Sequence, residues 1–157
     1  MHTWFECKIR YEKVMENGMQ KKVTEPYLVD ALSFTEAEAR IIKEMTPFIS
    51  GEFTVSDIKR ANYSELFPSD EESADRWFKC KLIFITLDEK SGAEKKTSTQ
   101  VLVQAADLRD AVKKLDEGMK GTMADYQIGM VSETPLMDVY PYSAEPNDKP
   151  EFDPSKA

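Results

Sequence analysis

Hydrophobic and charged residues alternate at the start of the chain, and the same pattern returns further along. From Phe5 to Glu12 every second residue is apolar or aromatic, and the residues between them are charged. This period of two is typical of a β-strand with one buried and one solvated face. The run Trp4-Phe5-Glu6-Cys7-Lys8-Ile9 has a counterpart, Trp77-Phe78-Lys79-Cys80-Lys81-Leu82, that begins 73 residues later. We therefore infer an internal duplication.

The residues after the first strand predict a β-hairpin. Asn17 and Gly18 tolerate positive φ at low steric cost, so they suit a turn, and a second strand is expected over residues 21–31. Pro26 lies within that strand and has no N–H to donate to a neighbour. We therefore expect the second strand to lie at a sheet edge or to carry a bulge.

A helix and a third strand follow the hairpin. Ser33 and Glu36 have the spacing of a capping box, in which the Ser33 hydroxyl accepts from the Glu36 N–H and the Glu36 carboxylate reaches back to the Ser33 N–H. Apolar residues at helical spacing continue to Met45, and Pro47 and Gly51 end the pattern. Alternation from Phe53 predicts a third strand that runs to about residue 62.

The second copy predicts the same elements in the same order. Its strands are expected over residues 78–84, 100–105 and 127–133, and Asp107 takes the N-cap position of its helix. The sequence thus predicts an α+β fold of two tandem β-β-α-β repeats, each with strand order 2-1-3, packed as a pseudo-dimer with the helices on one face of a mainly antiparallel sheet. The expected divisions are a first repeat over 1–68, an acidic linker over 69–76, a second repeat over 77–141 and a disordered acidic, proline-rich tail over 142–157.

The formal charge of −8 is unevenly distributed. Residues 1–64 and 77–141 each carry −1, residues 65–76 carry −4, and the tail carries −2. The repeats are therefore near neutral, and net charge neither favours nor excludes a polyanionic partner. No apolar run is long enough to span a bilayer, and no secretory signal is evident at the N-terminus. We expect a cytoplasmic protein that does not insert into membranes.

The two cysteines, Cys7 and Cys80, occupy equivalent places on the apolar side of a predicted strand. We expect both to be buried core residues, because a reducing compartment disfavours disulfides and neither has a second metal ligand nearby. A disulfide between the repeats or a shared metal is the sharper alternative.

Few residues point to catalysis. The only histidine is His2, and acid–base chemistry would therefore fall to carboxylates such as Glu36 and Glu38. Both lie in the first turn of the predicted helix, where carboxylates complement the helix dipole. Phosphate-binding loops, cysteine knuckles and nucleophile elbows are all missing from the sequence. We therefore expect no catalytic residue, no metal and no cofactor.

One surface pattern combines aromatic and basic residues. The outward side of the first strand of each repeat carries a tryptophan and two cations, which form the candidate binding face Trp4, Lys8, Arg10, Trp77, Lys79 and Lys81. Exposed aromatics and cations on a sheet can stack on and neutralise single-stranded nucleic acid. Against this, tryptophans that open a strand are often buried, and lysines on a strand discourage aggregation.

The motifs from Trp4 to Lys8, from Lys21 to Ala31 and from Ser33 to Arg40 resemble a bacterial family described as domain of unknown function 4494. The resemblance extends over about residues 1–141. It implies no activity and no site residue.

Three functional hypotheses remain from the sequence. The first is a non-enzymatic binding or adaptor protein with a protein partner, motivated by the duplication and by the lack of a reactive constellation. The second is single-stranded nucleic-acid binding through the candidate face. The third is a small enzyme with carboxylates at the interface between the repeats. The oligomeric state is not predicted.

Overall fold

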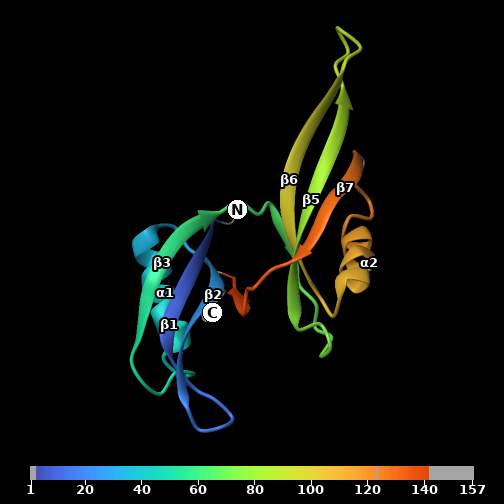
Figure 1. Ribbon diagram of the computed structural model, residues 1–157. Coiled ribbons are helices and arrows are strands. Elements are labelled where there is room, and N and C mark those ends of the chain that lie inside the picture. The colour runs from blue at the N-terminus through green and yellow to red at the C-terminus, as the bar shows by residue number, and fades with distance from the viewer. Residues whose placement is uncertain (1–2, 123, 142–157) are drawn as a thin grey trace, which may run out of the picture. The chain divides into compact units, whose positions relative to one another are not determined.

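The computed structural model describes residues 3–122 and 124–141, and most of their regular structure is strand (Figure 1). The elements are β1 (Trp4–Val14), β2 (Gln20–Asp30), α1 (Phe34–Met45), β3 (Phe53–Ala61), β4 (Glu65–Phe67), β5 (Arg76–Leu87), β6 (Glu94–Ala105), α2 (Leu108–Gly118), β7 (Asp125–Glu133) and β8 (Asp138–Tyr140). Strands account for 51% of the described residues and helices for 17%. The elements form two compact units: unit 1 contains residues 3–61 and 136–141, and unit 2 is Asn62–Pro135.

Unit 1 contains a four-stranded sheet with the order β3-β1-β2-β8. β1 pairs antiparallel with both β2 and β3, in agreement with the predicted order 2-1-3. A bulge interrupts the β1–β3 register between Lys8 and Ile9, so that Ser56 has no partner residue on β1. α1 packs against β1, β2 and β3.

Unit 2 follows the same plan. Its sheet has the order β4-β6-β5-β7, with β5 antiparallel to both β6 and β7. The β5–β7 register shifts between Lys81 and Leu82, which are the counterparts of Lys8 and Ile9, and Gly129 is the extra residue. α2 packs against β6, β7 and β4. The long β5–β6 hairpin extends beyond α2 (Figure 1).

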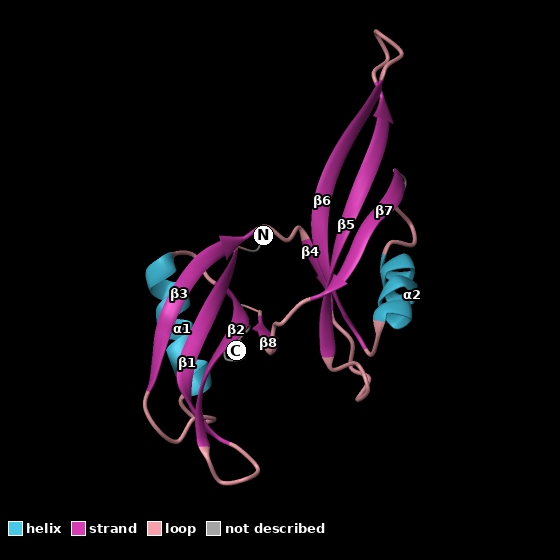
Figure 2. Cartoon of the chain, viewed as in Figure 1, coloured by secondary structure: helices cyan, strands magenta, loops and turns pink. Residues whose placement is uncertain are grey.

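A short parallel strand completes each sheet, and it comes from the C-terminal end of the other sequence repeat (Figure 2). β4 follows β3 in sequence, yet it pairs with Val101–Val103 of β6 in unit 2. β8 follows β7, yet it pairs with Tyr27–Val29 of β2 in unit 1. The sequence repeats and the compact units therefore divide the chain differently, and the acidic segment 69–76 joins β4 to β5 within unit 2.

Both helices begin at side-chain caps. Ser33 Oγ accepts from the Glu36 N–H at 3.1 Å, and Asp107 Oδ1 accepts from the Asp110 N–H at 2.8 Å. The predicted return bond of the capping box is displaced by one residue, because Glu36 Oε1 accepts from the Leu32 N–H at 2.5 Å instead of from Ser33. The second helix has the same arrangement, since Asp110 Oδ2 accepts from the Ala106 N–H at 2.9 Å.

Each unit has its own apolar core between the helix and the sheet. In unit 1 the core contains Cys7 and Ile9 of β1 with Ile41 of α1, all without measurable exposure. In unit 2 it contains Cys80 with Leu115 of α2, also fully buried. The prediction that both cysteines are core residues is confirmed. Both are free thiols in separate cores.

The predicted fold class is wrong. The chain is mostly β, and its two helices cover two separate sheets rather than one face of a common sheet. The alternation of polar and apolar residues did not predict β4 or β8, because three residues are too few to show a period of two. The prediction also shortened β6, whose first half, Glu94–Thr99, is polar on both faces and lacks the alternation of a half-buried strand.

The expected edge position of β2 holds only up to Pro26. β2 is not the edge of its sheet from Tyr27 to Val29, because β8 covers it there. The Pro26 carbonyl accepts from the Met137 N–H at 2.9 Å, just before β8 begins. Pro26 thus directly precedes the part of β2 that pairs with β8.

Candidate functional site

Unit 1 contains a cleft of about 250 Å³ that is lined mainly by aromatic and apolar side chains. Its walls come from β1, β2, the end of α1, the residues that follow α1, and β8. The lining residues are Tyr11, Tyr27, Met45, Phe48, Ile49, Met137, Asp138 and Tyr140. We call this site the tyrosine cleft.

Sheet register brings the three tyrosines to one face. Tyr27 lies opposite Cys7, a core residue on the helix side of the sheet, and Tyr11 follows Cys7 on the same side of β1. Tyr140 pairs with Val29, another core residue. The Tyr27 and Tyr140 rings stack with their centroids 6.2 Å apart and an interplanar angle of 22°. They form one wall of the cleft.

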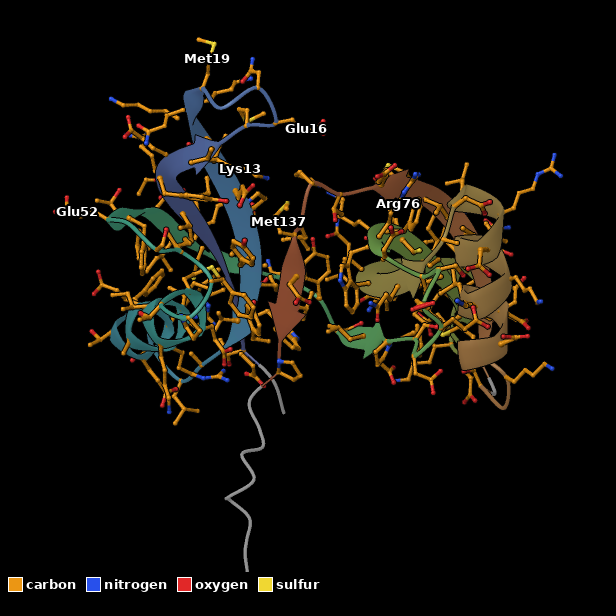
Figure 3. The ribbon with its side chains drawn as sticks, turned by 90° about the horizontal axis from the view of Figure 1, so that it is seen from below. Lys13, Glu16, Met19, Glu52, Arg76 and Met137 are labelled. Atoms are coloured by element: carbon orange, nitrogen blue, oxygen red, sulfur yellow. The ribbon has the colours of Figure 1, made fainter. Side chains whose placement is uncertain are left out.

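The rim of the cleft is apolar and exposed. Phe48 follows α1 in a turn in which its N–H donates to the Met45 carbonyl, and it is 76% exposed. Met137 directly precedes β8, lies beside β2 (Figure 3) and is 51% exposed. Met45 is buried below them. The cleft thus has an apolar floor and two unprotected apolar side chains at its mouth.

Glu25 holds the hydroxyls of two tyrosines that line the cleft. Its Oε1 accepts from the Tyr11 hydroxyl at 2.9 Å and from the Tyr27 hydroxyl at 3.3 Å. Its Oε2 lies 3.6 Å from Nζ of Lys13, a residue of β1 that is labelled in Figure 3. The Glu25 side chain is only 12% exposed. A largely buried carboxylate therefore holds two phenol groups in place.

The three phenols all have raised pKa values. Burial is the main cause at Tyr27, where the nearby Glu25 charge raises the pKa further. Burial, the Asp138 charge and the Glu44 charge raise the pKa of Tyr140 to about 12. Burial and the Glu25 hydrogen bond raise the pKa of Tyr11. At neutral pH the cleft therefore presents protonated phenols, which donate hydrogen bonds but do not act as bases.

Unit 2 carries different residues at the same sheet positions. The register opposite Cys80 and Val103 places Val101 and Phe67 where unit 1 has Tyr27 and Tyr140. Phe84 takes the place of Tyr11 and Thr99 the place of Glu25. The polar network is thus confined to unit 1, although the strands around it are alike.

Unit 2 has its own cavity of about 740 Å³, beside the end of α2. It is lined by Phe67, Pro68, Ser69, Asp70, Glu71, Lys114, Glu117 and Gly118. The Lys114 ammonium group in the cavity wall already has three partners. Lys114 Nζ lies 2.7 Å from Glu71 Oε1, and it lies 3.1 Å from Asp110 Oδ2 and from Ser69 Oγ. A Cβ at Gly118 would lie 2.8 Å from the Phe67 ring. These contacts join the segment after β4 to α2, and we interpret them as structural.

The two tryptophans of the candidate binding face are not exposed. Trp4 is 3% exposed and Trp77 is 5% exposed. They lie in different sheets, each on the face turned away from its helix. Neither indole is therefore available to stack on a base.

The four cations of the candidate face remain at or near the surface. Arg10 and Lys81 are exposed, and Lys8 and Lys79 are partly buried. Lys8 lies opposite Asp57 on β3. Without the indoles these residues are ordinary surface cations on two strands.

The carboxylates considered for catalysis are used by the helix start or lie in solvent. Glu36 accepts the Leu32 N–H, and Glu38 is exposed. Burial raises the pKa of the Cys7 thiol to about 12, with a smaller contribution from Glu6, and that of the Cys80 thiol to about 11. Both thiols are thus unreactive at neutral pH. Over residues 3–122 and 124–141 no group of three or more His, Cys, Asp or Glu side chains could hold a metal ion.

The tyrosine cleft was missed from the sequence. A signal was present, because the aligned repeats exchange tyrosine for phenylalanine at Tyr11 and Phe84 and at Tyr140 and Phe67. Such an exchange keeps the ring and changes only the hydroxyl.

The fold defines a protein of two related sheet-and-helix units, one of which contains an aromatic cleft. None of the helices in the described residues is long and apolar enough to cross a membrane. The chain belongs to the family described as Domain of unknown function (DUF4494), whose model matches residues 3–142. No curated protein matches the chain.

Proposed function

We propose that the chain is a non-enzymatic binding protein that arose by internal duplication, and that the tyrosine cleft of unit 1 receives a side chain of a protein partner. The observation that carries this proposal is the contrast between the units. Unit 2 builds the same sheet with Phe84, Val101 and Phe67 in place of the three tyrosines. The fold therefore does not require the hydroxyls or Glu25, which leaves recognition as their role.

The size and lining of the cleft fit one inserted side chain. Its volume of about 250 Å³ is below the roughly 300–1,000 Å³ typical of small-molecule sites. Tyr, Phe and Met are enriched where protein partners bind, and buried aromatic anchors supply most of the binding energy. The exposed Phe48 and Met137 would lose their contact with water on binding.

Charge around the cleft indicates the character of the partner. Asp138 lines the cleft, and its charge and that of Glu44 both act on Tyr140. Glu25 is offset by Lys13. We therefore expect a partner segment with an apolar side chain for the cleft and a basic residue beside it.

Nothing in the geometry favours the nucleic-acid hypothesis, because both indoles are buried. The carboxylate-enzyme hypothesis gains no support either, since Glu36 serves the helix start.

Site-specific photo-cross-linking in cells that make the protein tests the proposal. A photoreactive residue at Met137 should give one discrete protein adduct, and Phe48→Asp should abolish it. The matched control is Ser64, which precedes β4 as Met137 precedes β8, and it should give no such adduct. The cross-linked segment should contain Lys or Arg beside an apolar residue. No adduct at Met137, an equal adduct at Ser64, or an acidic segment would contradict the proposal.

A further inference from the structure

β7 is an open sheet edge in unit 2. The strand order β4-β6-β5-β7 places it at the end of the sheet, and among the described residues it pairs only with β5. The outward N–H and C=O groups of an edge strand form a template for another strand. Native proteins usually block such a template with charges, prolines or bulges.

The central part of β7 carries no charge. Its residues Tyr126-Gln127-Ile128-Gly129-Met130-Val131-Ser132 are all uncharged, and Ile128 and Met130 are 36% and 41% exposed. The other open edges are charged. Along β2 and β6, the stretches that β8 and β4 leave uncovered contain Lys21 and Lys22, and Lys95 and Lys96.

β3 of unit 1 is the matched control for β7. The register places Met130 opposite Lys81 and Asp57 opposite Lys8, so Met130 and Asp57 are equivalent. By the same register Ser132 corresponds to Lys59. The same structural positions therefore hold charges on one edge and none on the other.

Both edges carry a bulge at the same place. On β3 the extra residue is Ser56, whose hydroxyl donates to the Lys8 carbonyl at 3.3 Å. On β7 the extra residue is Gly129, where a Cβ would lie 2.9 Å from Ile83 Cδ1 of β5. The bulge is thus common to the two edges, and the contrast between them lies in their charges.

The ends of β7 are acidic. The strand begins at Asp125 and ends at Glu133, which lies 3.6 Å from Arg76. Pairing of β7 with a second copy of itself about Gly129 would place Asp125 opposite Glu133 twice, in chains of formal charge −8. Like charges directly opposite each other are destabilising, so a basic partner fits this edge better than a second copy does.

We propose that the free edge of β7 accepts an extended segment of another protein as a fifth strand, and that this segment is uncharged in the middle and basic at its ends. Main-chain hydrogen bonds to β7 supply the affinity, and the terminal cations facing Asp125 and Glu133 select the partner. This site is independent of the tyrosine cleft, which lies in unit 1.

A synthetic peptide tests the proposal on the full chain. The probe has nine residues, matching β7, with Lys at both ends and alternating Thr and Val between them. We expect binding that slows amide hydrogen exchange along β7. The double variant Met130→Asp/Ser132→Lys should weaken binding at least about tenfold. Its circular dichroism should be unchanged, because aspartate and lysine occupy the equivalent positions of β3.

Two control peptides separate strand addition from other binding. A copy N-methylated at alternate amides should not bind, since it cannot pair with an edge. A copy with Glu at both ends should bind more weakly than the Lys peptide. Absence of binding up to about 1 mM, equal binding by either control, or protection outside β7 would overturn the proposal. Dimerisation of the free chain that Met130→Asp abolishes would also overturn it, since the occupant would then be a second copy.

Discussion

Units 1 and 2 have nearly the same backbone plan and differ in what they offer to other molecules. Both have a long hairpin, a side-chain-capped helix, an edge strand with a bulge at the same place and a short parallel fourth strand. Unit 1 adds a cleft with three phenols, two of which donate to Glu25. Unit 2 has Val101, Phe67 and Thr99 at three of those positions. A shared scaffold thus separates the residues needed for folding from those free to change.

The two units also differ in the charge of their edge strands, and here unit 2 is the one that offers an open surface. Unit 1 keeps Asp57 and Lys59 on β3, whereas unit 2 has Met130 and Ser132 on β7. Each unit is therefore protected where the other is open. The two proposed binding sites thus lie on different surfaces of two similar frameworks.

The largest expected effect tests whether the two cores contribute equally. Ile41 and Leu115 occupy equivalent helix positions, and both are fully buried. Ile41→Ala and Leu115→Ala should each lower the free energy of unfolding by about 2–5 kcal/mol, through lost burial and the cavity left behind. Chemical denaturation followed by circular dichroism measures both. A cost below about 1 kcal/mol for one variant alone would show that the units are not equivalent in packing.

A smaller effect is expected at the helix caps. Ser33→Ala and Asp107→Ala each remove the acceptor for one backbone N–H at the start of a helix. Each should lower the free energy of unfolding by about 1 kcal/mol. The exposed neighbours Thr35 and Arg109 are matched controls, and their replacement by Ala should have little effect in the same denaturation experiment. Equal losses at cap and control would remove the capping role.

The smallest effect distinguishes the tyrosine cleft from its counterpart. The pKa values of Tyr11, Tyr27 and Tyr140 lie above the ordinary value of about 10. Their contribution to stability is therefore complete below about pH 10 and is lost as the pH rises through the folded pKa, about 12 for Tyr140. Glu25→Gln removes a charge that raises the pKa of Tyr27 and Tyr11.

Phenolate absorbance during an alkaline titration measures this change. Glu25→Gln should make part of the phenolate signal appear at lower pH than in the unmodified chain. Glu52, an exposed residue of unit 1, is the control, and Glu52→Gln should leave the titration unchanged. An unaltered curve for Glu25→Gln would mean that the carboxylate does not act on the phenols in solution.

Local patterns predicted the local elements well. The alternation of β1, the turn at Gly18 and the cap at Ser33 each depend on a few adjacent residues, and all three are present. The order of β1, β2 and β3 also follows, because a hairpin and a right-handed crossover leave few alternatives. β4 and β8 could not be placed in this way. Each joins a strand from the other sequence repeat, and no local pattern encodes that pairing.

Residue type alone misled the choice of site. Trp4 and Trp77 were expected on an outward face because alternation assigned them there, yet an outward face can still be covered, and both are buried. No pattern in the sequence singled out Tyr27 or Tyr140 as site residues. Their importance depends on the register that brings β8 beside β2, and on the buried Glu25 between two hydroxyls.

The exchanged strand β8 has a consequence for the synthesis of the chain. All of unit 2 is contiguous in sequence, from Asn62 to Pro135, so every strand of its sheet leaves the ribosome before β8 does. Unit 1 begins first, but its sheet is completed only by Asp138–Tyr140. At a synthesis rate of about 5–20 residues per second, the sheet of unit 1 lacks its fourth strand for several seconds after β2 has been made. The unit made first is thus the last to be completed, and the tyrosine cleft exists only once Asp138–Tyr140 has been made.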